Sequence, residues 1–188
     1  MSLQHAILGF LSWKPLTGYE LKKMFADSVT VYWSGNNNQI YRTLLDIHKK
    51  GFVTKEVQHQ DDAPSRKIYT ITEAGLEELR SWVLSPPEVP QLKHTFLIQL
   101  SWADQLSDDE LDHLISSYED EVHVHLLMLR KQAEVKTMSP ERTQRERYLW
   151  DMIMQNWIVM YETELQWVRQ LRHGLGDTTP ERKHNDGH

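Results

Sequence analysis

The order of the helix and strand signals in the first part of this chain constrains its fold more than any other feature. An apolar stripe at helical spacing predicts a helix over residues 2–12, which Pro15 ends. Thr17 and Glu20 then show the spacing of a capping box, in which two side chains satisfy free backbone N–H groups at the start of a helix. A short second helix is therefore expected directly after the first.

A third helix, a hairpin and a fourth helix are expected to follow. Ser34 can cap the third helix, and Gly51 suits the position just after its end. Residues 53–60 and 67–72 have the composition of two strands, and the polar run between them is typical of a turn. The fourth helix is expected over residues 73–84, before a pair of prolines.

This succession of helix, helix, helix, hairpin and helix is typical of a winged helix-turn-helix domain, which we assign to residues 1–85. Residues 86–93 are rich in proline and are expected to form a semi-rigid linker. A helical dimerisation or effector domain is expected over residues 94–173, and a disordered tail over residues 174–188. The predicted fold class is therefore mainly α, with an N-terminal winged helix-turn-helix and a C-terminal all-helical domain.

Two long helices dominate the expected C-terminal domain. Ser107 and Glu110 form a second capping box, and Ser139-Pro140 predicts the start of the last helix. That helix would run to about His173 and span roughly 50 Å at 1.5 Å per residue. Apolar residues recur along it every three to four positions: Trp150, Ile153, Trp157, Tyr161, Leu165, Val168 and Leu171. One short neighbouring helix cannot cover so wide a face, so we expect a homodimer.

Four consecutive amide side chains stand where the third helix begins. Asn and Gln present a donor beside an acceptor, which matches the major-groove edge of adenine, and recognition helices contact bases through their first turns. Tyr41 can donate to a phosphate, and Arg42 can reach guanine or phosphate. The DNA-contacting residues predicted on this helix are Asn37, Asn38, Gln39, Tyr41 and Arg42. The alternative is that the Asn run is only a loop before a helix.

Arg66 and Lys67 are the predicted DNA contacts of the hairpin, to phosphate or to the minor groove. A pair of basic residues is also common on ordinary solvated surface. Asp61 and Asp62, in the same turn, argue against deep insertion of the hairpin into a groove.

The charge balance gives DNA binding only weak support. Residues 1–85 hold 10 Lys+Arg and 9 Asp+Glu, which is a net charge of +1, and the rest of the chain is at −7. Nucleic-acid-binding domains usually carry a stronger basic excess. A second hypothesis is therefore an adaptor that keeps the winged fold and holds a partner protein through its Trp-rich helices. A stable homodimer favours the regulator, and a monomer that exposes Trp157 favours the adaptor.

Several other function classes lack their signals. The chain has no cysteine, which excludes disulfides and agrees with a reducing cytoplasm. No apolar run approaches the length that spans a bilayer, so a soluble protein that does not enter a membrane is expected. It shows no glycine-rich phosphate loop, no nucleophile elbow and no paired carboxylates in an apolar setting, so it is not expected to be an enzyme or to hold a cofactor. His123 and His125 are two apart on a helix and point to different faces, so no metal site is expected there. Metal sensing would be most plausible through His113 and Asp109.

Five short runs in residues 3–85 resemble the PadR-type transcriptional regulators: Ala6-Ile7-Leu8-Gly9-Phe10-Leu11, Leu16-Thr17-Gly18-Tyr19-Glu20-Leu21, Gln39-Ile40-Tyr41 with Leu44, Gly51-Phe52-Val53, and Tyr69-Thr70-Ile71-Thr72-Glu73-Ala74-Gly75. The resemblance implies a bacterial or archaeal dimeric repressor of a palindromic operator, with a helical domain that responds to a small molecule. The long C-terminal part is similar to the branch that includes phenolic-acid-responsive repressors. Gln39 and Tyr41 fall on DNA-facing family positions, and Arg42 stands where relatives often have Pro.

Aromatic residues are the candidates for an effector site. Trp150, Trp157 and Tyr161 can stack on an aromatic guest, and Tyr19 lies where the winged domain is expected to face the C-terminal one. For each of these residues the alternative is ordinary core packing. The partners expected are operator DNA, a second copy of the chain and a small aromatic effector.

Overall fold

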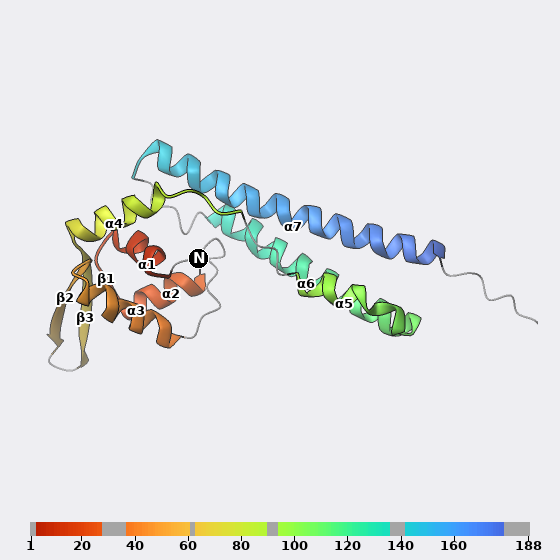
Figure 1. Ribbon diagram of the computed structural model, residues 1–188, viewed down its shortest axis with the longest axis horizontal. Coiled ribbons are helices and arrows are strands. Elements are labelled where there is room, and N and C mark those ends of the chain that lie inside the picture. Colours follow the sequence, from red (N-terminus) through yellow and green to blue (C-terminus); the bar gives the residue numbers. More distant parts are fainter. Residues whose placement is uncertain (1–2, 28–36, 61–62, 90–93, 136–141, 179–188) are drawn as a thin grey trace, which may run out of the picture. The chain divides into compact units, whose positions relative to one another are not determined.

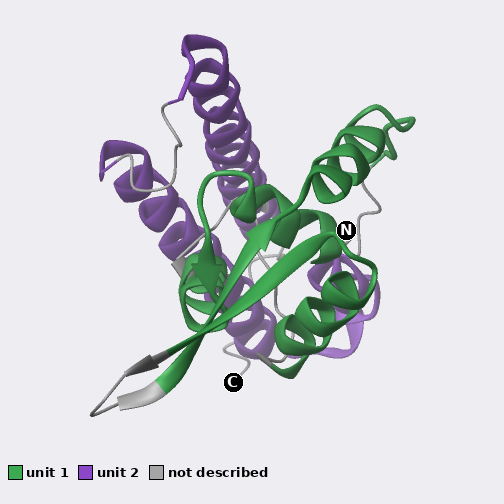
Figure 2. Cartoon of the chain, turned by 90° about the vertical axis from the view of Figure 1, so that its left-hand side faces the viewer, with its two compact units in different colours: residues 1–89 green, residues 90–188 purple. Residues whose placement is uncertain are grey.

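The computed structural model describes residues 3–27, 37–60, 63–89, 94–135 and 142–178. The chain divides into two compact units, residues 1–89 and 90–188 (Figure 2). The boundary between them lies inside the segment 86–93 that was expected to be a linker.

The first unit is a winged helix-turn-helix, as the sequence predicts, and its hairpin projects away from its helices (Figure 1). Its elements in chain order are α1 (Leu3–Leu11), β1 (Leu16–Thr17), α2 (Gly18–Asp27), α3 (Asn37–Lys49), β2 (Val53–Gln60), β3 (Ala63–Ile71) and α4 (Glu73–Val83). The strands form one antiparallel sheet in the order β1-β3-β2. The sequence did not predict β1, because two residues carry no alternation.

The hairpin is longer than expected. Val53 pairs with Ile71 at its base, and pairing continues through a register shift to Gln60 opposite Ala63. Strand β3 therefore begins four residues before Lys67, where the sequence predicted its start. Arg66 consequently lies in a paired strand instead of in the turn.

The core of the first unit is built from the apolar sides of its helices and sheet. Fully buried side chains come from α1, β1, α2, α3 and β2: Ile7, Leu8, Leu11, Leu16, Leu21, Leu44, Ile47 and Val53. Each such side chain contributes about 1.5–3 kcal/mol relative to an exposed position. This core buries one side of α3 and leaves the opposite side of the helix exposed to solvent.

The helix ends of the first unit form as the local signals predict. Thr17 N and Oγ1 donate to Glu20 Oε2 at 2.7 and 2.8 Å, and Glu20 N donates to Thr17 Oγ1 at 3.2 Å. Gly51 follows α3 with a φ of +75°, a conformation that glycine adopts without steric cost. Thr72 caps α4 by accepting a hydrogen bond from Gly75 N. Ser34, the expected cap of α3, lies outside the described residues.

The second unit is all-helical, as expected. It consists of α5 (Thr95–Ser101), the short 3-10 helix η1 (Ala103–Gln105), α6 (Asp108–Val135) and α7 (Gln144–Thr178). The capping box at the start of α6 forms, since Ser107 N and Oγ both donate to Glu110 Oε2 at 2.9 Å. Two buried clusters join these helices, Phe96 with Ile115 and Val168, and Val122 with Leu126 and Leu165.

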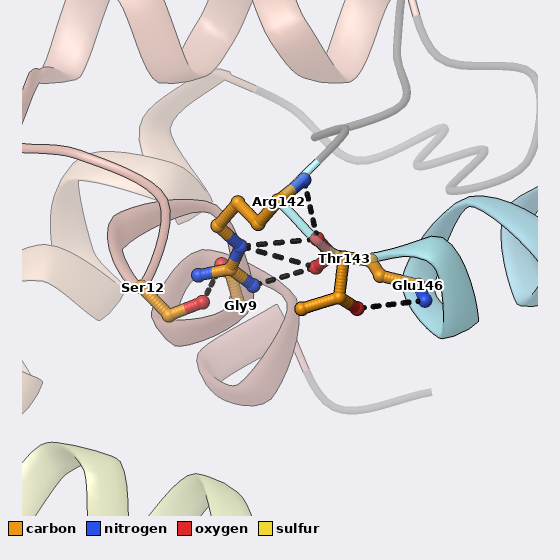
Figure 3. Close-up of polar contacts among 5 residues, drawn as sticks. All are labelled: Gly9, Ser12, Arg142, Thr143 and Glu146. Carbon is orange, nitrogen blue, oxygen red and sulfur yellow. Dashed lines mark hydrogen bonds and ion pairs between the residues drawn. The ribbon is translucent and has the colours of Figure 1, made fainter.

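Both ends of α7 differ from the prediction. The helix begins at Gln144, where Thr143 Oγ1 accepts from Glu146 N and the Arg142 guanidinium pairs with the Glu146 carboxylate at 2.6 Å (Figure 3). The expected start at Ser139-Pro140 lies outside the described residues. The helix continues past His173 to Thr178, because Leu175 packs against the cluster around Phe96. Residues 174–178, assigned to a disordered tail, are therefore helical.

The apolar stripe predicted on α7 is only partly buried within the chain. Leu165 and Val168 are buried, whereas Ile153 is 43% exposed and Trp150, Trp157 and Tyr161 are half-buried. Across the described helices, none combines the length and apolar character that crossing a bilayer requires.

Candidate nucleic-acid interface

Helix α3 has one buried side and one polar side. Ile40, Leu44 and Ile47 are buried in the core of the first unit. On the opposite side Asn38, Gln39 and Arg42 are exposed, and Tyr41 is 45% exposed. Asn37 is the first residue of the helix, and its side chain lies outside the described part of the chain. The first turns of α3 thus present the amides and the arginine that the sequence pattern singles out.

The hairpin presents the two predicted basic residues. Arg66 lies opposite Gln58 and Lys67 opposite Val57 in the β2–β3 register, and both cations are exposed. Pairing with β2 fixes the backbone of β3 at these positions. The two basic side chains therefore project from fixed places along the hairpin.

A groove of about 950 Å³ lies between the start of α2, the exposed side of α3 and strand β3. It brings together four of the predicted site residues, Tyr19, Tyr41, Arg66 and Lys67. Its other lining residues are Thr17, Gly18, Glu20, Leu45, Ser65 and Tyr69. Among the described residues, Asn38, Gln39 and Arg42 are exposed elsewhere on α3 and do not line it.

Some residues that line the groove shift the pKa of their neighbours. The pKa of Glu20 is lowered, first by the hydrogen bonds from Thr17 and further by the nearby charges of Lys14 and Arg66. The pKa of Tyr69 is raised, mainly by burial and also by Tyr41. The ionised form of Glu20 is therefore favoured in a groove that is also lined by the exposed residues Arg66 and Lys67.

Sequence reasoning missed Gly18 and Tyr69 as parts of this site. Tyr69 is a large residue in an apparent strand, and alternation there predicts a core position without revealing that the residue also lines a groove. Gly18 matters because the Tyr41 ring lies directly against it. Neither relationship leaves a local signal, since the partners come from different elements.

The four predicted effector residues lie in different places. Tyr19 is 70% exposed and belongs to the first unit, whereas Trp150, Trp157 and Tyr161 belong to α7 of the second. Tyr161 stacks on His125 with ring centroids 5.7 Å apart and packs against the cluster of Val122 and its neighbours. Core packing accounts for Tyr161, and the two half-buried tryptophans keep part of their rings accessible.

The fold and the polar side of α3 place this chain in the class of winged helix-turn-helix proteins. Residues 7–81 match the model of the transcriptional regulator PadR-like family, so the chain carries a PadR-like domain. The family and its matching relatives are transcriptional regulators and not enzymes, as the sequence analysis predicts.

Curated relatives and several solved structures are similar to this chain. The negative transcriptional regulator PadR of Bacillus subtilis is 31% identical over 113 residues, 60% of this chain but only 62% of that protein. The crystal structure of smu.1604c from Streptococcus mutans has a TM-score of 0.77 at 28% identity, covering 92% of this chain and 99% of that one. Bacillus subtilis PadR with operator DNA has a TM-score of 0.78 at 24% identity, covering 90% and 95%, and supports the fold. The same protein has also been solved with p-coumaric acid.

Proposed function

We propose that this chain is a ligand-responsive transcriptional regulator, a repressor that binds a palindromic operator as a homodimer. The observation that carries the proposal is the polar side of α3 in a PadR-like domain, where exposed Asn38, Gln39 and Arg42 stand opposite buried Ile40 and Leu44. The DNA complex of the Bacillus subtilis protein, which has the same fold, supports this use of the domain.

In the proposed complex α3 enters the major groove with its first turns against the base edges. Asn37, Asn38 and Gln39 supply amides that match adenine, and Arg42 contacts guanine or phosphate. Arg66 and Lys67 of the hairpin contact the backbone or the minor groove beside it. Only the amides and Arg42 would distinguish one base sequence from another, because contacts to phosphate carry no sequence information.

Self-association is supported by apolar side chains that the chain itself leaves uncovered in the second unit. Those of α7 are Tyr148, Leu149, Met152, Ile153, Val159 and Met160, and those of α6 are Val124, Leu127, Met128 and Val135. So wide an exposed face is unusual for a monomer and suits a two-fold interface. Two copies would place their α3 helices about 34 Å apart, in successive major grooves.

A small aromatic effector is the proposed signal. The half-buried rings of Trp150 and Trp157 and the exposed ring of Tyr19 are the proposed contacts, and Tyr161 supports α7 beside them. The p-coumaric acid complex of the Bacillus subtilis relative supports the ligand class. Binding would change the geometry of the paired winged domains and lower operator affinity.

Fluorescence anisotropy with DNA from the chain's own promoter tests the DNA contact. Affinity should fall steeply with salt, and Gln39→Ala should weaken it about tenfold or more, the effect of losing one bidentate base contact. Gln99→Ala, at an exposed glutamine of α5, is the matched control and should change nothing. Binding that is indifferent to both salt and Gln39→Ala rejects the proposal.

The adaptor remains the second candidate, because residues 1–85 carry a net charge of only +1. Size-exclusion chromatography with light scattering separates the two. The regulator requires a dimer that Ile153→Glu converts to a monomer with weakened operator binding, since a carboxylate is costly inside an apolar interface. A monomeric wild-type chain without DNA affinity favours the adaptor.

A further inference from the structure

A cleft of about 740 Å³ follows the line where α6 and α7 meet in the second unit. The two helices lie side by side and run in opposite directions (Figure 1). All the residues that line this α6–α7 cleft belong to these two helices. Its volume is typical of small-molecule sites, and none of its lining residues takes part in the DNA contact proposed above.

The α6–α7 cleft has an apolar floor and polar walls. Leu126 of α6 and Leu165 of α7 line it and are buried in one core cluster. His123, Gln166 and Gln170 line it as exposed side chains that form hydrogen bonds readily. The residues around the cleft include no phenyl, phenol or indole ring. This lining fits an amphipathic ligand whose apolar part is aliphatic.

The guanidinium groups at the α6–α7 cleft outnumber the carboxylates that pair with them. Arg130 Nη2 pairs one-to-one with Glu162 Oε1 at 2.7 Å. Arg169, by contrast, shares a carboxylate with Arg172. Arg169 Nε donates to Glu119 Oε1 at 2.9 Å, while Arg172 Nη1 lies 2.8 Å from the other oxygen of Glu119. One carboxylate thus serves two cations at this end of the cleft.

Asp112 does not restore the balance of charge. Its carboxylate is 3.8 Å from Arg172 Nε, too far for a hydrogen bond, and its side chain is 69% exposed, so water screens it. That Nε is a buried atom without a hydrogen-bond partner in the described part of the chain. Among the described residues, Arg169 bonds through Nε alone, which leaves its two Nη groups for a ligand. A single surplus cation suits a monoanion.

The α6–α7 cleft is separate from the apolar face proposed for self-association. On α7 the exposed apolar residues end at Met160, whereas the lining of the cleft begins at Glu162. On α6 the exposed residues Val124 and Met128 are each two positions from Leu126, about 200° around the helix axis, so they lie on the opposite side. Association through the apolar face would therefore leave the cleft open.

We propose that the α6–α7 cleft binds a small aliphatic carboxylic acid in its anionic form. The Nη groups of Arg169 pair with the carboxylate, Gln166 donates a further hydrogen bond, and the leucine floor contacts the hydrocarbon chain. Arg169 also joins α7 to α6 through Glu119, so the ligand acts on a contact between the two helices. Trp150 and Trp157 do not line this cleft, which makes it a second site beside the proposed aromatic one.

Isothermal titration calorimetry of the full chain with octanoate tests the proposal. Octanamide keeps the hydrocarbon chain without the charge, and acetate keeps the charge without the chain. Octanoate should bind at least about tenfold more tightly than either, because each comparison removes one of the two proposed interactions. Equal affinity for octanamide would exclude an anion site, and equal affinity for acetate would exclude the apolar floor.

Two matched pairs of variants on α7 locate the site. Arg169→Gln removes the proposed cation, and its control Arg145→Gln removes an exposed cation outside the cleft. Gln166→Glu adds a carboxylate one helical turn from Arg169, and its control Gln155→Glu adds one at an exposed position outside the cleft. Arg169→Gln and Gln166→Glu should each weaken octanoate binding about tenfold or more. The two controls should leave it unchanged.

Urea unfolding of each variant accompanies the titrations, because Arg169→Gln also loses its bond to Glu119. Gln166 makes no polar contact in the described part of the chain, so Gln166→Glu decides the test if Arg169→Gln is unfolded. A wild type that binds no octanoate at millimolar concentration, or a folded Gln166→Glu that binds it as the wild type does, would overturn the inference. Operator binding is a separate measurement, so either proposal can fail while the other stands.

Discussion

The ring of Tyr41 lies directly against the α-carbon of Gly18, so that a β-carbon at position 18 would come within 2.5 Å of Tyr41 Cε1. Gly18 is the first residue of α2 and Tyr41 lies in the second turn of α3. The missing side chain thus lets the two helices share one surface of the groove. Glycine is required here by close approach, since its φ is not in the left-handed region.

Gly18→Ala should weaken DNA binding more than it weakens the fold. The clash falls on the outer end of a half-exposed ring, which can rotate away, so the free energy of unfolding should fall by only about 1 kcal/mol. The Tyr41 hydroxyl moves with the ring and should leave the groove. Anisotropy titration and urea unfolding of the same variant check both parts, and a large stability loss with intact DNA affinity contradicts the prediction.

Gly75→Ala should instead destabilise the first unit strongly. A β-carbon there would meet the backbone oxygen of Phe52 and would lie 2.9 Å from Ile71 Cγ1. Phe52 O also accepts a hydrogen bond from Thr72 N at 3.0 Å, so the backbone cannot retreat freely. We expect a loss of about 3 kcal/mol in the free energy of unfolding. Urea denaturation measures it, and a loss as small as that of Gly18→Ala would show that the backbone yields.

Gly51→Ala and Gly9→Ala should shift stability in opposite directions. Gly51 has a φ of +75°, so alanine should cost about 1 kcal/mol there although no atom is within 4 Å. Gly9 lies inside α1, also with nothing within 4 Å, and alanine should stabilise it by about 0.5–1 kcal/mol. Thermal unfolding of both variants decides the signs. A destabilised Gly9→Ala would indicate that another surface packs on α1.

Glu20→Gln should destabilise the protein at neutral pH but not in acid. The hydrogen bonds from Thr17 lower the folded-state pKa of Glu20, so its stabilising contribution is present above the unfolded pKa and is lost as pH falls through the folded one. The group is exposed, which limits the effect to about 0.5 kcal/mol. Urea unfolding at pH 7 and below about pH 4 should show the difference from wild type shrinking in acid. Glu77→Gln, on the exposed surface of α4, is the control.

Tyr118→Phe should destabilise the second unit by about 1–2 kcal/mol. The Tyr118 hydroxyl donates to Glu164 Oε1 at 2.8 Å and lies 3.2 Å from His94 Nε2, so it joins α6 to α7 and to the start of α5. Burial, together with Glu164, raises the pKa of Tyr118 and keeps this donor protonated. Phenylalanine preserves the stacking on Phe96, whose centroid is 3.8 Å away. Tyr148→Phe should change the unfolding free energy by less than about 0.5 kcal/mol, and equal effects would contradict the assignment.

The features that the sequence predicts correctly are those whose causes lie within a few residues. The capping boxes of Thr17 with Glu20 and Ser107 with Glu110 form because both partners belong to one helical turn. Gly51 adopts its left-handed conformation for an equally local reason. The helix-and-hairpin order follows from such signals, and with it the winged fold.

The features that escaped prediction depend on partners far along the chain. Strand β1 exists only because β3 lies beside it, and α7 passes Gly174 because Leu175 reaches the cluster around Phe96. The groove shows the same limit: Tyr41 and Arg66 were singled out separately, but it is tertiary packing that makes them line one groove together with Tyr69. The exposure of Ile153, by contrast, agrees with the expectation that one neighbouring helix cannot cover the whole apolar face of α7.

The two residues of β1 give the hairpin a mechanical role. Leu16 and Thr17 are joined to the same strand that carries Arg66 and Lys67, and Thr17 is also the cap of α2. A displacement of β3 would therefore also displace the first turn of α2, where Gly18 lies against the Tyr41 ring of α3. In the proposed DNA complex, β1 would couple the contact of the hairpin with the DNA backbone to the orientation of α3.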